Sequence, residues 1–430
     1  VKPARATARE PAREPTREID RLRRLILGRE QDELRGVTAR LDDPERRAGE
    51  IARVLPEALA QSALCSETTL AISPVSPTIG PEARAKMDDK SKPLGALGQL
   101  EPLSIRMCRI QGTLTPQLRR KALLVFAGDH GITEEGVSAF PTEVTGQMVD
   151  NFLNGGAAIN VLCRHHEIEM KVVDMGVRKH FSPHPDLIMA KVAEGTKNMA
   201  LEPAMTEAQT LKALENGIKA FFALSENTPA IDGGWTPDPA RTREPIQILG
   251  LGEMGIGNTT SASAIISAAT GIDPAQAVGR GTGVDDKGLS HKTEVLERVL
   301  NFHCPDPENG FDILRRLGGF EIAGMAGAAL AAASQGCAVV LDGVISTAAG
   351  LIAYMINPDI QGYLISGHRS VEQAQAAALD HMGLEPVVDL SMRLGEGTGA
   401  ALAIDLAETA CKVMCEMASF DEAKISRSPA

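Results

Sequence analysis

The sequence is poor in aromatic residues and has no excess of positive charge. Phe, Trp and Tyr together make up 3% of its 430 residues. Proteins that bind single-stranded nucleic acids stack bases on exposed aromatic rings, so this composition argues against that class. The formal net charge of −12 argues against a surface that binds polyanions over the whole molecule. A local cationic site for one phosphate remains compatible with both observations.

The sequence also has no Cys-x-x-Cys pair, and its seven cysteines are odd in number. This pattern is neither a disulfide framework nor a zinc ribbon, and it favours a reducing compartment. The only adjacent histidines, His165 and His166, do not face the same way on a helix or a strand. We therefore predict no metal and no cofactor. We expect a cytoplasmic protein, with organelle targeting by the Arg-rich N-terminus left open because Glu and Asp interleave with Arg there.

No apolar run is a candidate membrane span. The longest apolar region, residues 322–355, is interrupted by Ser334, Gln335 and Asp342 and is dominated by Ala and Gly. It is typical of a helix, a strand and a second helix in a buried core.

The N-terminal part, residues 1–85, differs in composition from the rest. Residues 5–17 are rich in Arg, Glu and Pro without an apolar period, which indicates disorder. Short helices are predicted from about residue 16 and over about 51–59, and the Ser-, Thr- and Pro-rich residues 66–81 are interpreted as a linker. We predict an N-terminal extension over 1–85, disordered or loosely helical, and assign it no function.

From residue 86 onward, apolar strands alternate with Ala-rich helices. Strands are predicted at 122–127, 170–175, 246–251, 338–341 and 362–365, with helices such as 259–269 and 320–333 between them. Strands without polar alternation are buried on both faces. The fold class predicted is α/β, with a mostly parallel, Rossmann-like sheet flanked by helices.

Glycine is plentiful, at 41 residues, and it gathers with polar residues where these strands end. Such loops are predicted at 128–131, 250–260, 342–343 and 366–370, and a fifth at 392–400, where Glu396 lies between glycines before an apolar helix. Ligands bind beyond the carboxyl ends of parallel strands, so five such loops indicate a ligand site. We expect Glu396 to be exposed at the mouth of its helix; the alternative is a glycine-rich turn with a solvated acid.

The 250–260 loop also resembles a dinucleotide fingerprint, Gly250-x-Gly252-x-x-Gly255, followed by Asp273. Asp273, however, follows no predicted strand, so an NAD-dependent oxidoreductase is the second hypothesis, which measurable NAD binding would favour. The simpler interpretation is a phosphate cradle, in which Asn258, Thr259 and Thr260 begin a helix. Lys292 and Ser370 are candidates for the same anion, although a solvated surface lysine is the ordinary alternative for Lys292.

Together these loops resemble one family, the nicotinate-nucleotide–dimethylbenzimidazole phosphoribosyltransferases (the CobT family). The resemblance runs in order over about residues 86–417, through the stretches 92–101, 127–131, 252–260, 318–325, 341–343, 366–370 and 393–400. It implies transfer of the phosphoribosyl group of nicotinate mononucleotide to 5,6-dimethylbenzimidazole or a related base, with inversion at the anomeric carbon. The products would be α-ribazole 5'-phosphate and nicotinate, for the lower ligand of cobalamin.

The resemblance also implies roles for individual residues. It makes Glu396 the general base and Glu253 a second active-site carboxylate, with the phosphate near Gly255, Gly257, Lys292 and Ser370 and the ribose near Asp342. The full set of candidate substrate-binding residues is Gly255, Gly257, Asn258, Thr259, Lys292, Asp342, Ser370, Phe140, Met148, Gly395 and Gly397.

The residue types suit this chemistry. Nicotinate leaves from a ring that is already cationic, so a single carboxylate that removes the N–H proton of the incoming base suffices. Desolvation would raise the pKa of that carboxylate towards neutrality. Phe140 and Met148 predict an apolar base pocket, which leaves other benzimidazoles, purines and phenols open. A third hypothesis is a nucleotide- or corrinoid-precursor-binding protein without turnover, against which the presence of both Glu253 and Glu396 argues.

The resemblance further implies a homodimer with no nucleic-acid or membrane partner. We expect residues 86–430 to form the phosphoribosyltransferase domain. Within it, a large α/β lobe would span about 120–400, and a small helical lobe would combine 86–115 with 400–425.

Overall fold

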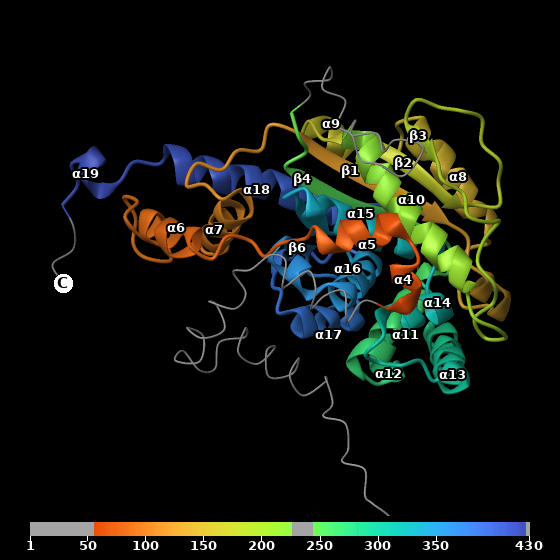
Figure 1. Ribbon diagram of the computed structural model, residues 1–430. Helices are drawn as coiled ribbons and strands as arrows, with labels where there is room; N and C mark the ends of the chain where they lie inside the picture. Colours follow the sequence, from red (N-terminus) through yellow and green to blue (C-terminus); the bar gives the residue numbers. More distant parts are fainter. Residues whose placement is uncertain (1–55, 226–243, 282, 427–430) are drawn as a thin grey trace, which may run out of the picture. The chain divides into compact units, whose positions relative to one another are not determined.

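The computed structural model describes residues 56–225, 244–281 and 283–426, and it contains one seven-stranded parallel sheet in the order β3-β2-β1-β4-β5-β6-β7 (Figure 1). The strands are β1 (Lys121–Gly128), β2 (Glu169–Gly176), β3 (Leu187–Met189), β4 (Ile248–Met254), β5 (Ala338–Leu341), β6 (Leu364–His368) and β7 (Pro386–Val388). Each neighbouring pair is parallel. The predicted α/β class with a parallel, helix-flanked sheet is confirmed.

The five predicted strands are β1, β2, β4, β5 and β6, which form the interior of the sheet. Their apolar runs were visible in the sequence because both faces are buried. The two strands that were not predicted, β3 and β7, lie at the edges and are three residues long each. Pro386 opens β7, which is possible because an edge strand can lack one backbone donor.

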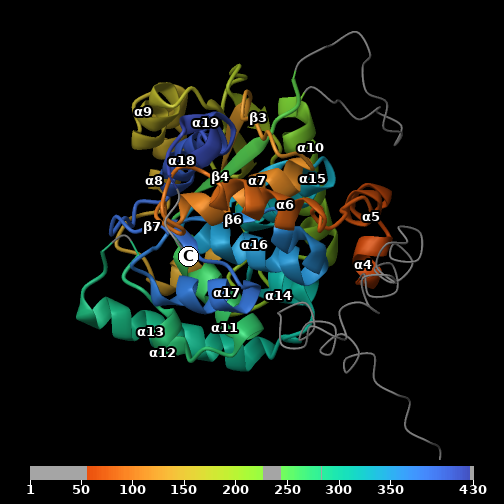
Figure 2. The ribbon, with the colours of Figure 1, turned by 90° about the vertical axis from the view of Figure 1, so that its left-hand side faces the viewer.

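Helices cover both faces of this sheet (Figures 1 and 2). On one face lie α10 (Glu207–Ser225), α15 (Phe320–Ser334) and α16 (Val344–Ile356), with α5 (Ala63–Leu70) packed outside α10 and α15. On the other face, α18 (Thr398–Glu416) crosses β4, β5, β6 and β7 and contacts α9 (Ala158–His165). The remaining helices are α4 (Glu57–Ala60), α6 (Ile79–Asp88), α7 (Leu100–Gln111), η1 (Gly131–Glu135), α8 (Glu143–Leu153), α11 (Asn258–Thr270), α12 (Pro274–Ala277), α13 (Asp286–His303), α14 (Gly310–Leu317), η2 (Pro358–Gly362), α17 (Gln373–Met382) and α19 (Phe420–Ala423).

The small residues of α15 allow it to touch α10 backbone to backbone. A β-carbon on Gly217 of α10 would lie 1.9 Å from the Gly324 carbonyl oxygen, and one on Gly327 would lie 2.1 Å from the Leu214 carbonyl oxygen. Any side chain at these positions would separate the two helices. The Ala- and Gly-rich composition of 322–355 therefore serves close packing in the core.

A small helical lobe combines α6 and α7 with the C-terminal end of the described chain (Figure 1). In it α6 and α7 pack against the C-terminal half of α18 around a separate apolar cluster of Ala83, Met87, Ile105, Cys108 and Met414. Lys90 forms a β-bridge with Ser419. The lobe begins at α6, slightly before the predicted residue 86.

The compact unit that holds the sheet already includes α4 and α5, whereas the change in composition placed its start at residue 86. The predicted linker over 66–81 is wrong, because α5 occupies its first part and Ile72 and Val75 are buried. The Thr69 carbonyl accepts a hydrogen bond of 2.9 Å from the Asn357 side chain. Residues 1–55 of the predicted extension, with the helix predicted from about residue 16, lie outside the described residues, and α4 overlaps the end of the helix predicted over about 51–59.

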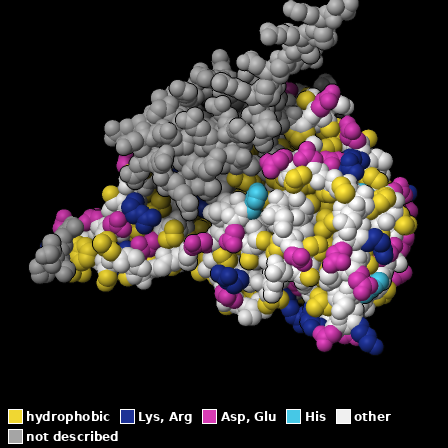
Figure 3. All heavy atoms as spheres, turned by 90° about the horizontal axis from the view of Figure 1, so that it is seen from below, with side chains coloured by type: hydrophobic (Ala, Val, Ile, Leu, Met, Phe, Trp, Pro, Cys, Tyr) yellow, Lys and Arg dark blue, Asp and Glu magenta, His cyan; other side chains and the backbone are white. Residues whose placement is uncertain are grey.

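The described surface carries mixed charge. In Figure 3, acidic and basic side chains are interspersed with apolar and uncharged ones over the part of this face that is coloured by type. Within the described ranges, no helix is both long and apolar enough to cross a membrane.

Candidate active site

A cavity of about 320 Å³ lies beyond the carboxyl ends of the central strands. Four of the five predicted loops line it, together with the start of α8. The lining residues are Phe140, Val144, Met148, Glu253, Met254, Gly255, Ile256, Asn258, Thr259, Gly281, Gly343, Val344, Ile345, His368, Ser370, Glu372, Arg393, Leu394, Gly395 and Glu396. The structure thus brings together most of the residues that the sequence predicted for the site.

Glu396 lies in a turn of three consecutive left-handed residues. The φ angles are 82° at Gly395, 64° at Glu396 and 94° at Gly397. The turn packs directly on β4, because a β-carbon on Gly252 would lie 2.3 Å from the Glu396 carbonyl oxygen. The expected exposed position is wrong: Glu396 is only 6% exposed, since β4 and α18 enclose the turn.

The buried Glu396 carboxylate is poorly satisfied. Its Oε2 atom is buried and has no hydrogen-bond partner among the described residues. Burial raises its pKa above the ordinary value, the nearby Asp342 adds to the rise, and the Ile159 backbone N–H opposes it. An unpaired carboxylate oxygen at the edge of a cavity is costly for stability, and its presence indicates a role with a ligand.

Glu253, at the end of β4, is the second carboxylate of the cavity. A β-carbon on Gly395 would lie 2.4 Å from Glu253 Oε1, so this acid sits against the Glu396 turn. The Asn258 side-chain amide donates a hydrogen bond to Glu253 Oε2. Burial, the charges of Asp342, Glu321 and Glu396, and the opposing Asn258 bond together bring the pKa of Glu253 to about 8. The cavity therefore holds a carboxyl that is protonated near neutral pH.

This shift predicts a pH-dependent stability. A carboxyl with a raised folded-state pKa stabilises the fold below its ordinary pKa of 4.5, and this contribution is lost as the pH rises through about 8. At about 1.4 kcal/mol per pKa unit, the largest contribution that this shift can make to the free energy of unfolding is about 5 kcal/mol. Relaxation of the structure around the ionised carboxylate makes the actual contribution smaller. We expect Glu253→Gln to raise the free energy of unfolding by about 2 kcal/mol more at pH 9 than at pH 5. Denaturant titrations at both pH values measure this, and the exposed Glu385→Gln should show no such difference.

Most of the predicted phosphate residues line a hollow that continues from the cavity, whereas Ser370 lines the cavity but not the hollow. Gly257 and Lys292 line it, and it shares Gly255, Asn258 and Thr259 with the cavity. The Lys292 ammonium donates to Thr259 Oγ1 at 2.8 Å and to the Gly279 carbonyl at 3.2 Å. The surface alternative for Lys292 is wrong: the side chain is buried, and this burial lowers its pKa to about 8.

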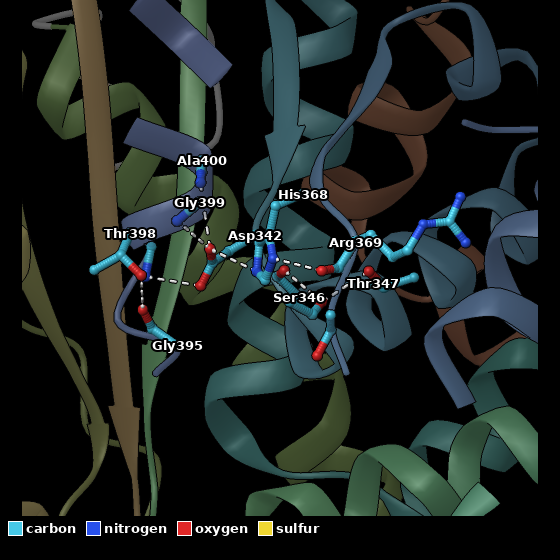
Figure 4. A network of polar contacts seen from close by, with 12 residues as sticks. Asp342, Ser346, Thr347, His368, Arg369, Gly395, Thr398, Gly399 and Ala400 are labelled. Carbon is cyan, nitrogen blue, oxygen red and sulfur yellow. Dashed lines mark hydrogen bonds and ion pairs between the residues drawn. The ribbon is translucent and has the colours of Figure 1, made fainter. Parts of the chain in front are cut away.

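Asp342 and Gly397, also predicted for the substrate, lie behind the cavity wall. The Asp342 carboxylate is 1% exposed and accepts hydrogen bonds from the backbone of α18, including one of 3.0 Å from Gly397 (Figure 4). Both of its carboxylate oxygens thus accept hydrogen bonds from backbone N–H groups of the protein itself.

Three of the matched stretches lie outside the cavity lining. His130 Nε2 is 2.6 Å from Glu321 Oε1, and this buried pair lies beneath the 255–257 loop, where a Gly255 β-carbon would lie 2.5 Å from the Gly128 carbonyl oxygen. The 92–101 stretch lies in the small lobe, where Lys92 pairs with Glu101 at 2.7 Å. These residues support the folded loops of both lobes.

Comparison with known proteins now identifies the chain. The family model described as phosphoribosyltransferase matches residues 72–425. The nicotinate-nucleotide–dimethylbenzimidazole phosphoribosyltransferase of Roseiflexus sp. (strain RS-1) is 48% identical over 363 residues, which cover 84% of this chain and 98% of that protein. The protein of the same name from Chloroflexus aggregans is 47% identical over the same share of this chain and 98% of its own length. This chain belongs to the nicotinate-nucleotide–dimethylbenzimidazole phosphoribosyltransferase family.

Solved structures agree with that membership. The crystal structure of CobT from Thermus thermophilus matches with a TM-score of 0.74 at 39% identity, covering 82% of this chain and all of that one. The chain is therefore a phosphoribosyltransferase of the CobT family with the parallel α/β fold of that family.

The hypothesis of an NAD-dependent oxidoreductase is not compatible with this fold. Gly250 and Gly252 lie inside β4, where a β-carbon on Gly250 would meet Leu123 and Ile404 of the core. Asp273 caps α12 by accepting a hydrogen bond of 2.8 Å from the Ala275 backbone. Neither glycine belongs to a strand-to-helix turn, so the pattern match arose from close packing.

Three polar residues of this phosphoribosyltransferase cavity were not predicted from the sequence: His368, Glu372 and Arg393. All three lie in or beside loops that were singled out, but local spacing does not show which side chains turn inwards. Glu372 illustrates this, since it accepts a 3.0 Å hydrogen bond from the Gly281 backbone, 91 residues away.

Proposed function

We propose that the cavity transfers the phosphoribosyl group of nicotinate mononucleotide to a ring nitrogen of 5,6-dimethylbenzimidazole or a related base, in formation of the cobalamin lower ligand. The observation that carries the proposal is the Glu396 carboxylate, whose buried Oε2 atom has no partner among the described residues although it borders the cavity. A general base needs such an open acceptor and a pKa raised by burial.

In the proposed reaction, Glu396 accepts the N–H proton of the base while the other ring nitrogen attacks C1′ of the ribose from the side opposite nicotinate. The bond between C1′ and the pyridinium nitrogen breaks, and its electron pair neutralises the departing nicotinate ring. Glu253, protonated near neutral pH with a pKa of about 8, offers an O–H donor. Until the proton transfer is complete, the ionised Glu396 carboxylate also stabilises the positive charge that develops at C1′.

The lining suggests where each part of the substrates binds. The phosphate would occupy the hollow beside Thr259 and Lys292, where a cation and hydroxyls converge. The base would lie against an apolar wall of Phe140, Val144 and Met148, of which the last two are one helical turn apart on α8. The homodimer that the resemblance implied is part of this proposal, and light scattering in solution tests it.

The direct test is incubation of the full chain with nicotinate mononucleotide and a panel of bases, with nicotinate measured by chromatography. We expect nicotinate release that requires both the nucleotide and an acceptor base. Absence of release with every benzimidazole, together with tight NAD binding, would overturn the proposed reaction.

Phe140→Ser should weaken selectivity for the methylated base. Each buried methyl group contributes about 0.8 kcal/mol, so loss of the Phe140 contact should lower kcat/KM for dimethylbenzimidazole about 3- to 10-fold relative to unsubstituted benzimidazole. Competition between the two bases measures the ratio directly. Met189→Ser, which removes another exposed apolar side chain away from the cavity lining, should leave the ratio unchanged.

A further inference from the structure

Asp342 directs its whole carboxylate at the start of α18. Its Oδ2 atom accepts a hydrogen bond of 3.0 Å from the Gly397 N–H, and its Oδ1 atom accepts bonds of 2.6 Å from Gly399 and 3.2 Å from Ala400 (Figure 4). The side chain is 1% exposed and comes directly after β5. One buried carboxylate thus binds three backbone N–H groups of a helix start that lies 55 residues later in the chain.

This contact replaces a cap that α18 lacks. The N-cap residue is Gly397, which has no side chain to accept from the first N–H groups of the helix. A carboxylate at the positive end of a helix makes strong, charge-assisted hydrogen bonds. Asp342 therefore fixes the N-terminus of α18 to the end of β5.

The capped segment includes the turn that carries the proposed base. Glu396 has a φ of 64°, a conformation that a residue with a β-carbon adopts only where its surroundings enforce it. Gly397, whose N–H binds Asp342, is the next residue in the chain. The position of the Glu396 carboxylate thus depends on a bond one residue away.

His368 lies between Asp342 and the cavity. Its Nε2 atom is 3.6 Å from Asp342 Oδ1, and its Nδ1 atom is 3.1 Å from the Arg369 carbonyl oxygen. The ring lines the cavity. It fits only because residue 399 is glycine, since a β-carbon added at that residue would lie 2.0 Å from the ring. The imidazole ring thus lies beside the carboxylate on its cavity side.

We infer that Asp342 is a positioning residue, which holds Glu396 in its reactive orientation by capping α18, and that His368 keeps the Asp342 carboxylate in place. This inference rests on the proposed function, in which Glu396 is the general base. In this inference Asp342 positions Glu396, whereas the sequence had led us to expect it near the ribose.

The test compares Asp342→Asn with a matched control. Asn keeps the size of the side chain but loses one of the two acceptor oxygens, so kcat should fall about tenfold or more while KM for nicotinate mononucleotide changes less than about threefold. The control is Asp174→Asn, at a carboxylate that is also 1% exposed and accepts hydrogen bonds of 3.1 and 2.9 Å from Gly176 and Val177 at the end of β2. It should lower Tm comparably yet leave kcat within about twofold. Equal losses of kcat in the two variants, or a change confined to KM, would overturn the inference.

A double variant separates this inference from the proposed function. If Asp342 acts through Glu396, Glu396→Gln combined with Asp342→Asn should be as slow as Glu396→Gln alone. A further loss of about tenfold in the double variant would overturn the positioning role. Near-wild-type turnover of Glu396→Gln alone would instead overturn the base assignment.

If Asp342→Asn does not fold, a pair of variants at His368 provides the test instead. His368→Gln keeps an N–H donor near the Nε2 position, whereas His368→Leu does not. We expect kcat of the Leu variant to fall about fivefold or more and the Gln variant to recover most of that loss. Equal losses would overturn the supporting role of His368.

Discussion

Glu396→Gln is expected to lower kcat about 10²- to 10⁴-fold, the range that a positioned general base contributes. Gln has the same size and keeps one oxygen, but its neutral amide cannot take the proton of the incoming base. The affinity for nicotinate mononucleotide should stay within about threefold of the wild type, because only the proton transfer is removed. Rapid-quench measurement of nicotinate formation and equilibrium titration of the nucleotide give the two quantities separately.

The pH profile adds an independent check. Burial raises the pKa of Glu396, and the base acts only when ionised, so kcat of the wild type should rise with pH above the ordinary range of a glutamate. This rise should be absent from the small residual rate of Glu396→Gln. Glu408→Gln, on the helix α18 that follows the Glu396 turn and paired with Lys121 and Lys412, is the control and should keep both rate and profile. Turnover of Glu396→Gln near that of the control would contradict the assignment.

Lys292→Met should lower kcat/KM for nicotinate mononucleotide about 10- to 100-fold. A hydrogen bond to a charged group contributes about 1.5–3 kcal/mol, and burial shields this one from solvent. Met retains much of the aliphatic stem, so the packing around α13 and Thr259 should be preserved. Lys287→Met, at an exposed position of the same helix, should change kcat/KM less than about twofold.

The lowered pKa of Lys292 makes the same interaction sensitive to pH. Desolvation brings this pKa from 10.5 to about 8, so the free protein loses the ammonium charge as the pH rises through about 8. Nucleotide affinity in the wild type should therefore fall over that range, with proton uptake on binding. Isothermal titration in buffers of different ionisation enthalpy measures the uptake. A wild-type affinity that stays constant from about pH 7 to about pH 9 would show that Lys292 does not bind the phosphate.

The interior of the sheet could be predicted because each central strand is an unbroken apolar run. The edge strands gave no such signal, since β3 and β7 are short and partly exposed. The helix α5 was hidden for a different reason: its Ser- and Thr-rich sequence resembles a linker, and its place is set by contacts such as Thr69 with Asn357, 288 residues away. Local pattern carries no information on such distant partners.

The site shows the same division between local and distant causes. The loops of the cavity could be predicted because they follow strands and carry glycines. The burial of Glu396 and Lys292 could not, since it depends on β4 passing under one turn and on Thr259 and Gly279 enclosing one ammonium group. The use of Asp342 as a helix cap needed the register of β5 against α18, which spacing along the chain does not give.

The 19-residue helix α18 carries the Glu396 turn at one end and packs into the small lobe at the other. A helix of that length is a stiff rod of about 28 Å. A tilt of α18 consequently moves the Glu396 turn and the small lobe together. A tilt that displaces Met414 by a few ångströms must also shift the Glu396 carboxylate, so precise placement of the proton acceptor depends on how firmly the small lobe holds the C-terminal half of α18.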